Sequence, residues 1–279
     1  ATSTVDGNSN TIYIGHNDGM SVIQEKAGDA TNGAVKYYTN NRITEEMTGD
    51  IRLMAPLNGT LSTSTAANTT IANADASVKL NPLTTSGAEG QPAYATGVRG
   101  TGLTFDGVND YVCTGTTGTC ADDTDLDVTG NLSMGAWIKP SATNNNFVIA
   151  KRADTGTRSY QLQVVSGNVN AGIFNGTTCG GGCTATSTTT LSTGTWYYVA
   201  GTYDGTNVRV YVNGTLEATT AAGGGITDSS ATLLIGAYNN TDTTFAGHFS
   251  GTIDEPFVTA EALTPGQIKR MYEVGKRAL

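Results

Sequence analysis

The stretch LLIGAYNNTDTTFAGHFSGTIDEPFVT, residues 233–259, decides the fold of this chain. It opens with a short apolar run ending in glycine, passes through a polar loop, and is predicted to form a strand from Phe249 onward. Alternate side chains of a strand point to opposite faces. One face is therefore predicted to carry Phe249, Gly251, Ile253 and Glu255, and the other Ser250, Thr252 and Asp254. An ionisable side chain within a strand costs free energy unless it is solvated, paired or bound to a metal, so Asp254 needs an explanation.

The composition is that of an all-β protein. Of 279 residues only 14% are charged, glycine and threonine are abundant, and no segment has the alternating charges of a long helix. The net charge of −9 argues against nucleic acid or an anionic membrane as a partner. No apolar run approaches the length of about 18 residues that spans a bilayer, so we expect no membrane insertion.

The four cysteines fall into two local pairs, Cys113 with Cys120 and Cys179 with Cys183. Neither spacing is typical of zinc sites, and no histidine lies near either pair. We therefore predict two small-loop disulfides and an oxidising, extracellular or cell-surface location. The alternative is that the four cysteines are reduced thiols with a structural role.

Many short strands separated by turns follow one another through the chain. The clearest are predicted at residues 103–105, 110–113, 132–138, 147–150, 159–164, 196–203, 208–212 and 215–218. Turns at intervals of about ten residues favour an antiparallel sandwich. Trp137 and Trp196 lie in alternating runs and are predicted to be core residues. A last, helical element has Thr264 as its N-cap and Pro265 at its first position.

The N-terminal part is predicted to be separate from the sandwich. Residues 1–40 are expected to form a β-hairpin extension, with strands at 10–15 and 19–23 around an Asp-Gly turn. The phrase TIYIGHNDGMSVI resembles one β-propeller repeat, and a single copy cannot close a propeller. Instead of being part of a propeller, these strands could serve self-association by pairing with a neighbouring subunit. Residues 41–50 are predicted to be a polar linker in which Thr44 is a candidate N-cap.

Five phrases carry a resemblance to a known family. They are LTFDGVNDYV (103–112), LSMGAWIKP (132–140), TGTWYYVAGTYDGTNVRVYVNGTLEA (193–218), LLIGAYNN (233–240) and FSGTIDEPFVTAEALTPGQIKRMY (249–272). Their order and spacing resemble the laminin G-like, concanavalin A-like lectin/glucanase family over residues 51–279. The resemblance implies a jelly-roll sandwich of two antiparallel sheets, with the N-terminal hairpin extension outside it and a short C-terminal helix.

The resemblance also implies a structural calcium site. Many members of the family hold calcium beside the terminal Ile-Asp-Glu strand, and the matching residues here are Asp75 and Asp254. The glycines usual in the first loop are missing around Asp75, which puts half of the site in doubt. The alternative for Asp254 is hydrogen bonding to backbone N–H groups of a neighbouring loop.

Catalysis is not expected. Glucanases of this fold use carboxylates spaced along one strand, and no strand here carries such a cluster. The densest acidic run comprises Asp122, Asp123, Asp125 and Asp127, and acidic loops are usually solvated. Only His16 and His248 are present, and no G-x-S-x-G turn accompanies them.

Binding of a glycan or cell-surface polysaccharide is the leading functional hypothesis. Aromatic rings stack on sugars while amide and guanidinium groups bond the hydroxyls. The candidate ligand-binding residues are Tyr94, Asn144, Arg152, Arg158, Tyr238, Asn239 and Phe245. The competing hypothesis is a structural subunit of a cell-surface assembly, joined by strand exchange at the N-terminus.

Overall fold

The computed structural model describes residues 92–116, 119–153, 158–176, 182–241, 244–277 and 279, and the backbone of five strands before residue 92. The chain divides into two compact units, residues 1–51 and 52–279. Self-association through the first unit stays a prediction.

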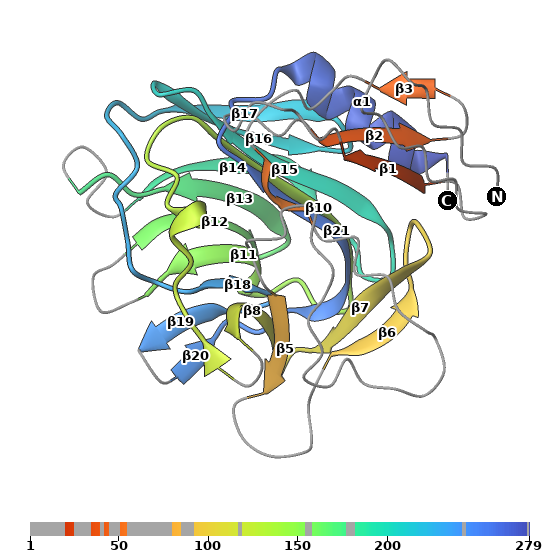
Figure 1. Ribbon diagram of the computed structural model, residues 1–279, viewed down its shortest axis with the longest axis horizontal. Coiled ribbons are helices and arrows are strands. Elements are labelled where there is room, and N and C mark those ends of the chain that lie inside the picture. The colour runs from red at the N-terminus through yellow and green to blue at the C-terminus, as the bar shows by residue number, and fades with distance from the viewer. Residues whose placement is uncertain are drawn as a thin grey trace. The chain divides into compact units, whose positions relative to one another are not determined.

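The first unit contains a three-stranded antiparallel sheet (Figure 1). Its strands are β1 (Met20–Gln24), β2 (Val35–Thr39) and β3 (Arg42–Thr44). The predicted strand at 10–15 lies outside the described residues, and β1 pairs with β2. Residues 42–44, at the start of the predicted linker 41–50, form β3 and continue the sheet with Ile43 opposite Tyr38. Ile43 and Thr44 are β-branched, which favours a strand over the predicted N-cap.

The second unit is built on two eight-stranded sheets (Figure 1). The first has the order β17-β16-β15-β10-β21-β7-β6, and β4 also pairs with β21. Its strands are β4 (Ile51–Met54), β6 (Ala93–Thr96), β7 (Thr101–Asp106), β10 (Leu132–Pro140), β15 (Tyr197–Tyr203), β16 (Asn207–Val212), β17 (Thr215–Ala221) and β21 (Ser250–Thr259).

The second sheet has the order β14-β13-β12-β11-β18-β8-β5, with β9 paired to β8. Its strands are β5 (Leu80–Thr84), β8 (Asp110–Thr116), β9 (Thr119–Cys120), β11 (Asn146–Arg152), β12 (Arg158–Val165), β13 (Asn168–Ile173), β14 (Cys183–Thr190) and β18 (Leu233–Ile235). A separate hairpin joins β19 (Tyr238–Thr241) to β20 (Thr244–Ala246). The prediction of an antiparallel concanavalin A-like sandwich is confirmed.

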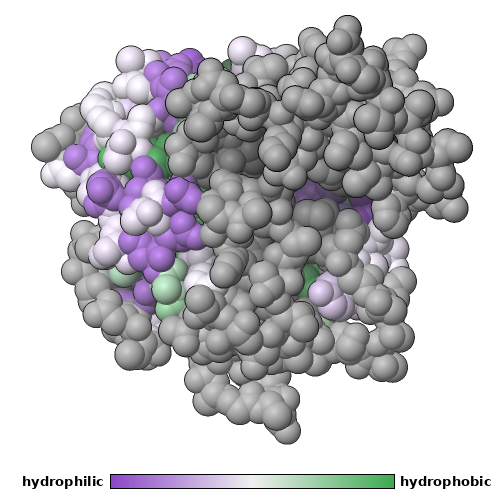
Figure 2. Space-filling view, viewed as in Figure 1, coloured by the Kyte–Doolittle hydropathy of each residue, from purple (hydrophilic) through white to green (hydrophobic). Residues whose placement is uncertain are grey.

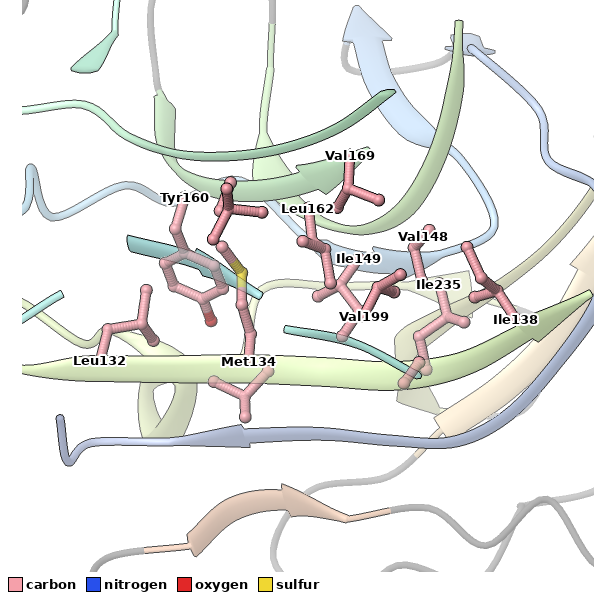
Figure 3. Close-up of a cluster of buried hydrophobic side chains, with 14 of the residues drawn as sticks. Leu132, Met134, Ile138, Val148, Ile149, Tyr160, Leu162, Val169, Val199 and Ile235 are labelled. Atoms are coloured by element: carbon pink, nitrogen blue, oxygen red, sulfur yellow. The ribbon is translucent and has the colours of Figure 1, made fainter. Parts of the chain in front are cut away.

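The core lies between the two sheets. Figure 3 shows Val148, Ile149, Tyr160, Leu162, Val169 and Ile235 of the second sheet facing Leu132, Met134, Ile138 and Val199 of the first. Each of these side chains is at most 2% exposed. Such burial is the main source of stability in a sandwich of this kind.

A β-bulge corrects the predicted alternation of the terminal strand. Gly135 lies opposite Phe257 and Trp137 opposite Asp254, so Glu255 and Pro256 together face one residue of β10. Glu255 takes a positive φ of 48° at this point. The core-facing residues of β21 are therefore at odd-numbered positions up to Ile253 and at an even-numbered position after the bulge, where Val258 faces the core. Glu255 does not share the face of Ile253 as alternation predicted.

The C-terminal helix, α1 (Pro265–Lys276), covers the outer face of the first sheet. Thr264 caps it in a reciprocal arrangement with Gln267, which confirms the predicted helix start. The ring of Trp137 is stacked on Tyr272 at 5.7 Å and lies directly against Gly275, where no other residue would fit. Trp137 is buried as predicted, but Trp196 is half-buried because β15 begins only after it.

The described residues visible in Figure 2 are mostly hydrophilic or of intermediate hydropathy, with small hydrophobic spots among them. The exposed large hydrophobic residues, Val108, Leu216 and Leu279, are scattered along the chain. No helix in the described part of the chain is long and apolar enough to cross a membrane.

Candidate functional site

Five side chains gather on the face of the second sheet that is turned away from the core. Two of them are the predicted arginines, which lie at the end of β11 and the start of β12. The others come from β11, from the connection after β13, and from β19. We call this group the aromatic–arginine cluster: Phe147, Arg152, Arg158, Phe174 and Tyr238.

The Arg152 guanidinium is the centre of the cluster. Its Cζ lies 4.6 Å from the ring centre of Tyr238, 5.4 Å from that of Phe147 and 5.7 Å from that of Phe174. Nη1 donates a 2.7 Å hydrogen bond to Oε1 of Gln161. Arg158 lies 5.6 Å from the Phe174 ring. Each cation–π contact contributes about 0.5–2 kcal/mol, so several together hold the guanidinium in one place.

Two glycines allow the rings to approach the backbone. A Cβ on Gly247 would lie 2.5 Å from the Phe147 ring and 3.0 Å from the Tyr238 ring. A Cβ on Gly182 would lie 2.7 Å from the Phe174 ring. Both glycines also have positive φ, which other residues adopt at a cost. The sequence therefore places glycine where the rings need the space.

The β19–β20 hairpin carries Tyr238 and was predicted to be a polar loop. The structure corrects this prediction, because Tyr238 pairs with Ala246 and Asn239 with Phe245. The hairpin base is closed by hydrogen bonds from Phe249 N to Gly236 O at 2.8 Å and from Phe147 N to Gly247 O at 2.9 Å. The hairpin therefore holds Tyr238 against β11.

Five of the seven predicted ligand-binding residues are brought into this region: Arg152, Arg158, Tyr238, Asn239 and Phe245. Asn239 is only 6% exposed, and its Oδ1 has no hydrogen-bond partner among the described residues. Phe245 packs on Tyr111 with 4.4 Å between ring centres.

The other two predicted ligand-binding residues lie elsewhere. Tyr94 is in β6 of the opposite sheet and packs against the core. Asn144 is exposed in the connection before β11.

The structure gives Asp254 a role as a loop anchor. Its Oδ2 accepts hydrogen bonds from Val98 N at 2.8 Å and Arg99 N at 3.0 Å, and its Oδ1 accepts one from Glu255 N at 2.9 Å. The side chain is fully buried. Burial and, secondly, the Glu255 charge raise the pKa of Asp254 to about 7, and the three N–H donors oppose this rise.

Calcium at Asp254 stays a prediction. Its carboxylate accepts three backbone N–H bonds, and no group of three potential ligands of the His, Cys, Asp and Glu type occurs in the described ranges. Asp75, the other predicted ligand, lies outside the described residues. The geometry at Asp254 matches hydrogen bonding to a neighbouring loop, which the sequence left as the alternative.

The acidic run at residues 122–127 is partly engaged in ion pairs. The buried ammonium of Lys151 donates to Asp122 Oδ1 at 2.5 Å and to the carbonyl of Ala231 at 2.8 Å, and lies 2.9 Å from Asp127 Oδ1. Asp123 caps the short 3-10 helix η1 (Thr124–Leu126). The expectation of a solvated loop therefore fails at Asp122 and Asp127, because a buried lysine needs their charges.

The predicted disulfide between Cys113 and Cys120 is present. It lies on the outer face of the second sheet with Tyr111, Leu234 and Phe245. Cys183 is also disulfide-bonded, and Cys179, its predicted partner, lies outside the described residues.

The sequence did not single out Phe147, Phe174, Gln161 and Lys151. Gln161 had a usable signal, because it alternates with the core residues Tyr160 and Leu162 and must face outward. The others depend on which strands become neighbours. Ala150 lies opposite Gln161 of the next strand on one side and opposite Leu234 on the other, and the second pairing joins segments far apart in the sequence.

Comparison with known proteins agrees with this architecture. Residues 106–269, more than half of the chain, match a family described as the concanavalin A-like lectin/glucanases superfamily. A search of curated proteins found no match.

Several solved structures share the fold at low identity. Domain 4 of AbnA, an extracellular GH43 arabinanase from Geobacillus stearothermophilus in complex with arabinotriose, has a TM-score of 0.55 and 19% identity over 80% of this chain and 99% of that one. The binding domain of Paraclostridial Mosquitocidal Protein 1 has a TM-score of 0.57 and 10% identity, over 81% and 52%. The binding domain of Botulinum Neurotoxin DC in complex with SialylT has a TM-score of 0.55 and 13% identity, also over 81% and 52%. At these identities the likeness is one of fold.

Proposed function

Because the chain belongs to the concanavalin A-like lectin/glucanases superfamily, we propose that it is a non-catalytic, extracellular carbohydrate-binding module. The observation that carries the proposal is the position of Tyr238, whose ring packs on Phe147 at 4.5 Å and under the guanidinium of Arg152. Binding sites for small polar ligands combine rigid aromatic surface with a few fixed polar groups. The aromatic–arginine cluster offers both, and it is the proposed sugar site.

Two similar structures support a glycan as the ligand. One is a complex with arabinotriose, and the other is a complex with SialylT. For this chain we propose a glycan or cell-surface polysaccharide. The disulfide between Cys113 and Cys120 supports an oxidising, extracellular location.

The bonding of the carboxylates supports a role without catalysis. Asp254 accepts three backbone N–H bonds, and Asp122 is paired with Lys151. Asp204 pairs with Arg209 at 2.5 Å, which with bonds from Thr206 and Asn207 holds its pKa below the ordinary range in spite of burial. Glycoside hydrolysis needs two carboxyl groups facing one bond, and these carboxylates each bond to the protein instead.

A glycan array probed with the whole chain tests the proposal. We expect binding to a defined set of oligosaccharides and release of no reducing ends from them. Tyr238→Ala is expected to weaken binding at least tenfold, and Tyr94→Ala, a matched tyrosine on the opposite sheet, to leave it within twofold.

The array is run with and without a chelator, since calcium stays a prediction from the family resemblance. Binding to no glycan under either condition would contradict the proposal and favour the assembly hypothesis. Cleavage of a bound glycan would contradict the non-catalytic role.

A further inference from the structure

His248 lies in the short segment between β20 and β21, where the chain passes from the hairpin to the first sheet. Its Nδ1 is 3.2 Å from the backbone oxygen of Asp110, and its Nε2 is 3.3 Å from the backbone oxygen of Phe245. Asp110 begins β8, and Phe245 lies in β20. The half-buried ring therefore connects the hairpin to the sheet through two carbonyl groups.

These two contacts require a particular protonation state. A neutral imidazole has one N–H and one lone-pair nitrogen, so it can donate to only one of the two oxygens. The other nitrogen would then direct its lone pair at a carbonyl oxygen. The doubly protonated ring has two N–H groups and donates to both carbonyls. The geometry is thus complete only when the ring is charged.

The titratable groups beside His248 belong to β8 and to the end of β7. Asp110 is 3% exposed, and its carboxyl Oδ2 accepts a 2.8 Å hydrogen bond from Asp106 N. Burial raises the pKa of Asp110 to about 6, opposed by the Asp106 N–H and assisted by the Asp106 charge. Tyr111, 6.4 Å from the His248 ring, has a pKa raised by burial to about 12 and stays neutral. The pKa of Asp110 therefore lies within the pH range of the test, and variants at both residues are needed.

Loss of one contact would act on the proposed sugar site through the hairpin. Phe245 is in β20, and its partner strand β19 begins with Tyr238. Tyr238 makes the 4.6 Å contact with Arg152 at the centre of the aromatic–arginine cluster. The backbone bonds at the hairpin base persist in either protonation state, so loss of one His248 contact loosens the β20 side of the hairpin, which pairs with the strand of Tyr238, without releasing the hairpin.

We propose that doubly protonated His248 positions the β19–β20 hairpin on the second sheet, so that glycan binding at the aromatic–arginine cluster strengthens as the pH falls below neutral. The inference has a positioning half, which concerns the hairpin, and a binding half, which concerns the glycan. Only the binding half rests on the proposed function. His248 is a positioning residue and acts on the ligand through Tyr238. Histidine is the side chain whose charge ordinarily changes between pH 5 and 8.

The positioning half is tested without any ligand. Long-range ¹H–¹⁵N NMR reports the protonation of both ring nitrogens, and assignment is simple because the chain has only two histidines, one of which His16→Gln removes. We expect both nitrogens of His248 to carry protons at pH 5.5. Amides in β19 and β20, with exchange rates corrected for their intrinsic pH dependence, should become roughly fivefold less protected at pH 8, the effect of one hydrogen bond.

Two variants assign the response. His248→Gln is expected to remove the pH dependence of protection, and Asp110→Asn is expected to keep it. The opposite pattern would make Asp110 the responsible group and overturn the inference. Equal protection at both pH values in the unmodified protein would also overturn it.

The binding half uses an oligosaccharide selected on the array. Its Kd is expected to be roughly fivefold lower at pH 5.5 than at pH 8, and the His248→Gln variant to differ by less than twofold. Equal affinity at both pH values would overturn the inference and leave the proposed function intact. Absence of binding at both pH values, with the protection response intact, would overturn the proposed function and leave the positioning of the hairpin standing.

Discussion

Asp254 stabilises the fold by satisfying three backbone N–H groups inside the protein. Its substitution by Ala leaves those donors buried without an acceptor, and each such loss costs about 1–3 kcal/mol. We expect Asp254→Ala to lower the free energy of unfolding by roughly 3 kcal/mol or more, measured by urea denaturation. The exposed helix residue Glu273 provides the control, since Glu273→Gln also removes one negative charge. Similar losses in the two variants would contradict the anchoring role.

The raised pKa of Asp254 gives this residue a pH signature. Its folded-state pKa of about 7 lies above the ordinary value of 3.8, so the folded state binds the proton more tightly. Its contribution to stability is therefore complete below about pH 4 and is lost as the pH rises toward 7. Asp254→Asn cannot titrate, and its unfolding free energy should decline less between pH 4 and 7 than that of the unmodified protein. A parallel decline would argue against titration of Asp254 in this range.

Lys151 is the internal cation of the acidic loop, with no exposed side-chain surface. Lys151→Met would leave Asp122 and Asp127 facing each other without a counter-charge. Because those carboxylates are 26% and 18% exposed, we expect a loss of about 2–4 kcal/mol by urea denaturation, at the lower end for a buried pair. Adding Asp122→Asn and Asp127→Asn to Lys151→Met should recover part of this loss. An unchanged or deeper loss in the triple variant would rule out charge as the cause.

Among the elements, the β19–β20 hairpin decides whether the cluster forms. Gly247→Ala would place a Cβ 2.5 Å from the Phe147 ring at a residue with φ of +62°. Gly194→Ala has comparable backbone strain, at φ +75°, with nothing within 4 Å. We expect both substitutions to lower the free energy of unfolding, and Gly247→Ala to lower it by about 1–3 kcal/mol more than Gly194→Ala. Only Gly247→Ala is expected to weaken glycan binding. Equal effects on stability and binding would show that ring contact at Gly247 is unimportant.

The elements that the sequence predicts best are those with strong local signals. Alternating apolar residues indicated β10, and Thr264 with Pro265 indicated the start of α1. The strand β14, CTATSTTT, was missed because it lacks large apolar residues, and its place is set by pairing with β13. The bulge at Glu255 was missed because it depends on the register with β10, which is a non-local property.

For the domain as a whole, the sequence predicted which types of residue form the candidate site, but it predicted only some of the individual residues. Arg152, Arg158 and Tyr238 were chosen from the sequence as loop polar and aromatic residues, and strand pairing brings them together. Tyr94 had the same local signal and lies on the other sheet. The sequence singled out neither Phe147 nor Phe174, and their contacts with Arg152 depend on which strands become neighbours. Sheet order arises from contacts between distant segments, which local patterns do not encode.

The central claim is that a glycan binds on the aromatic–arginine cluster. The most direct measurement is an NMR titration of the ¹⁵N-labelled protein with an oligosaccharide selected on the array. We expect the largest shift changes at the Arg152 and Arg158 side-chain Nε–H groups and at the amides of Phe174 and Tyr238. Changes centred on β6 and β7 of the opposite sheet, or no changes at millimolar ligand, would contradict the central claim.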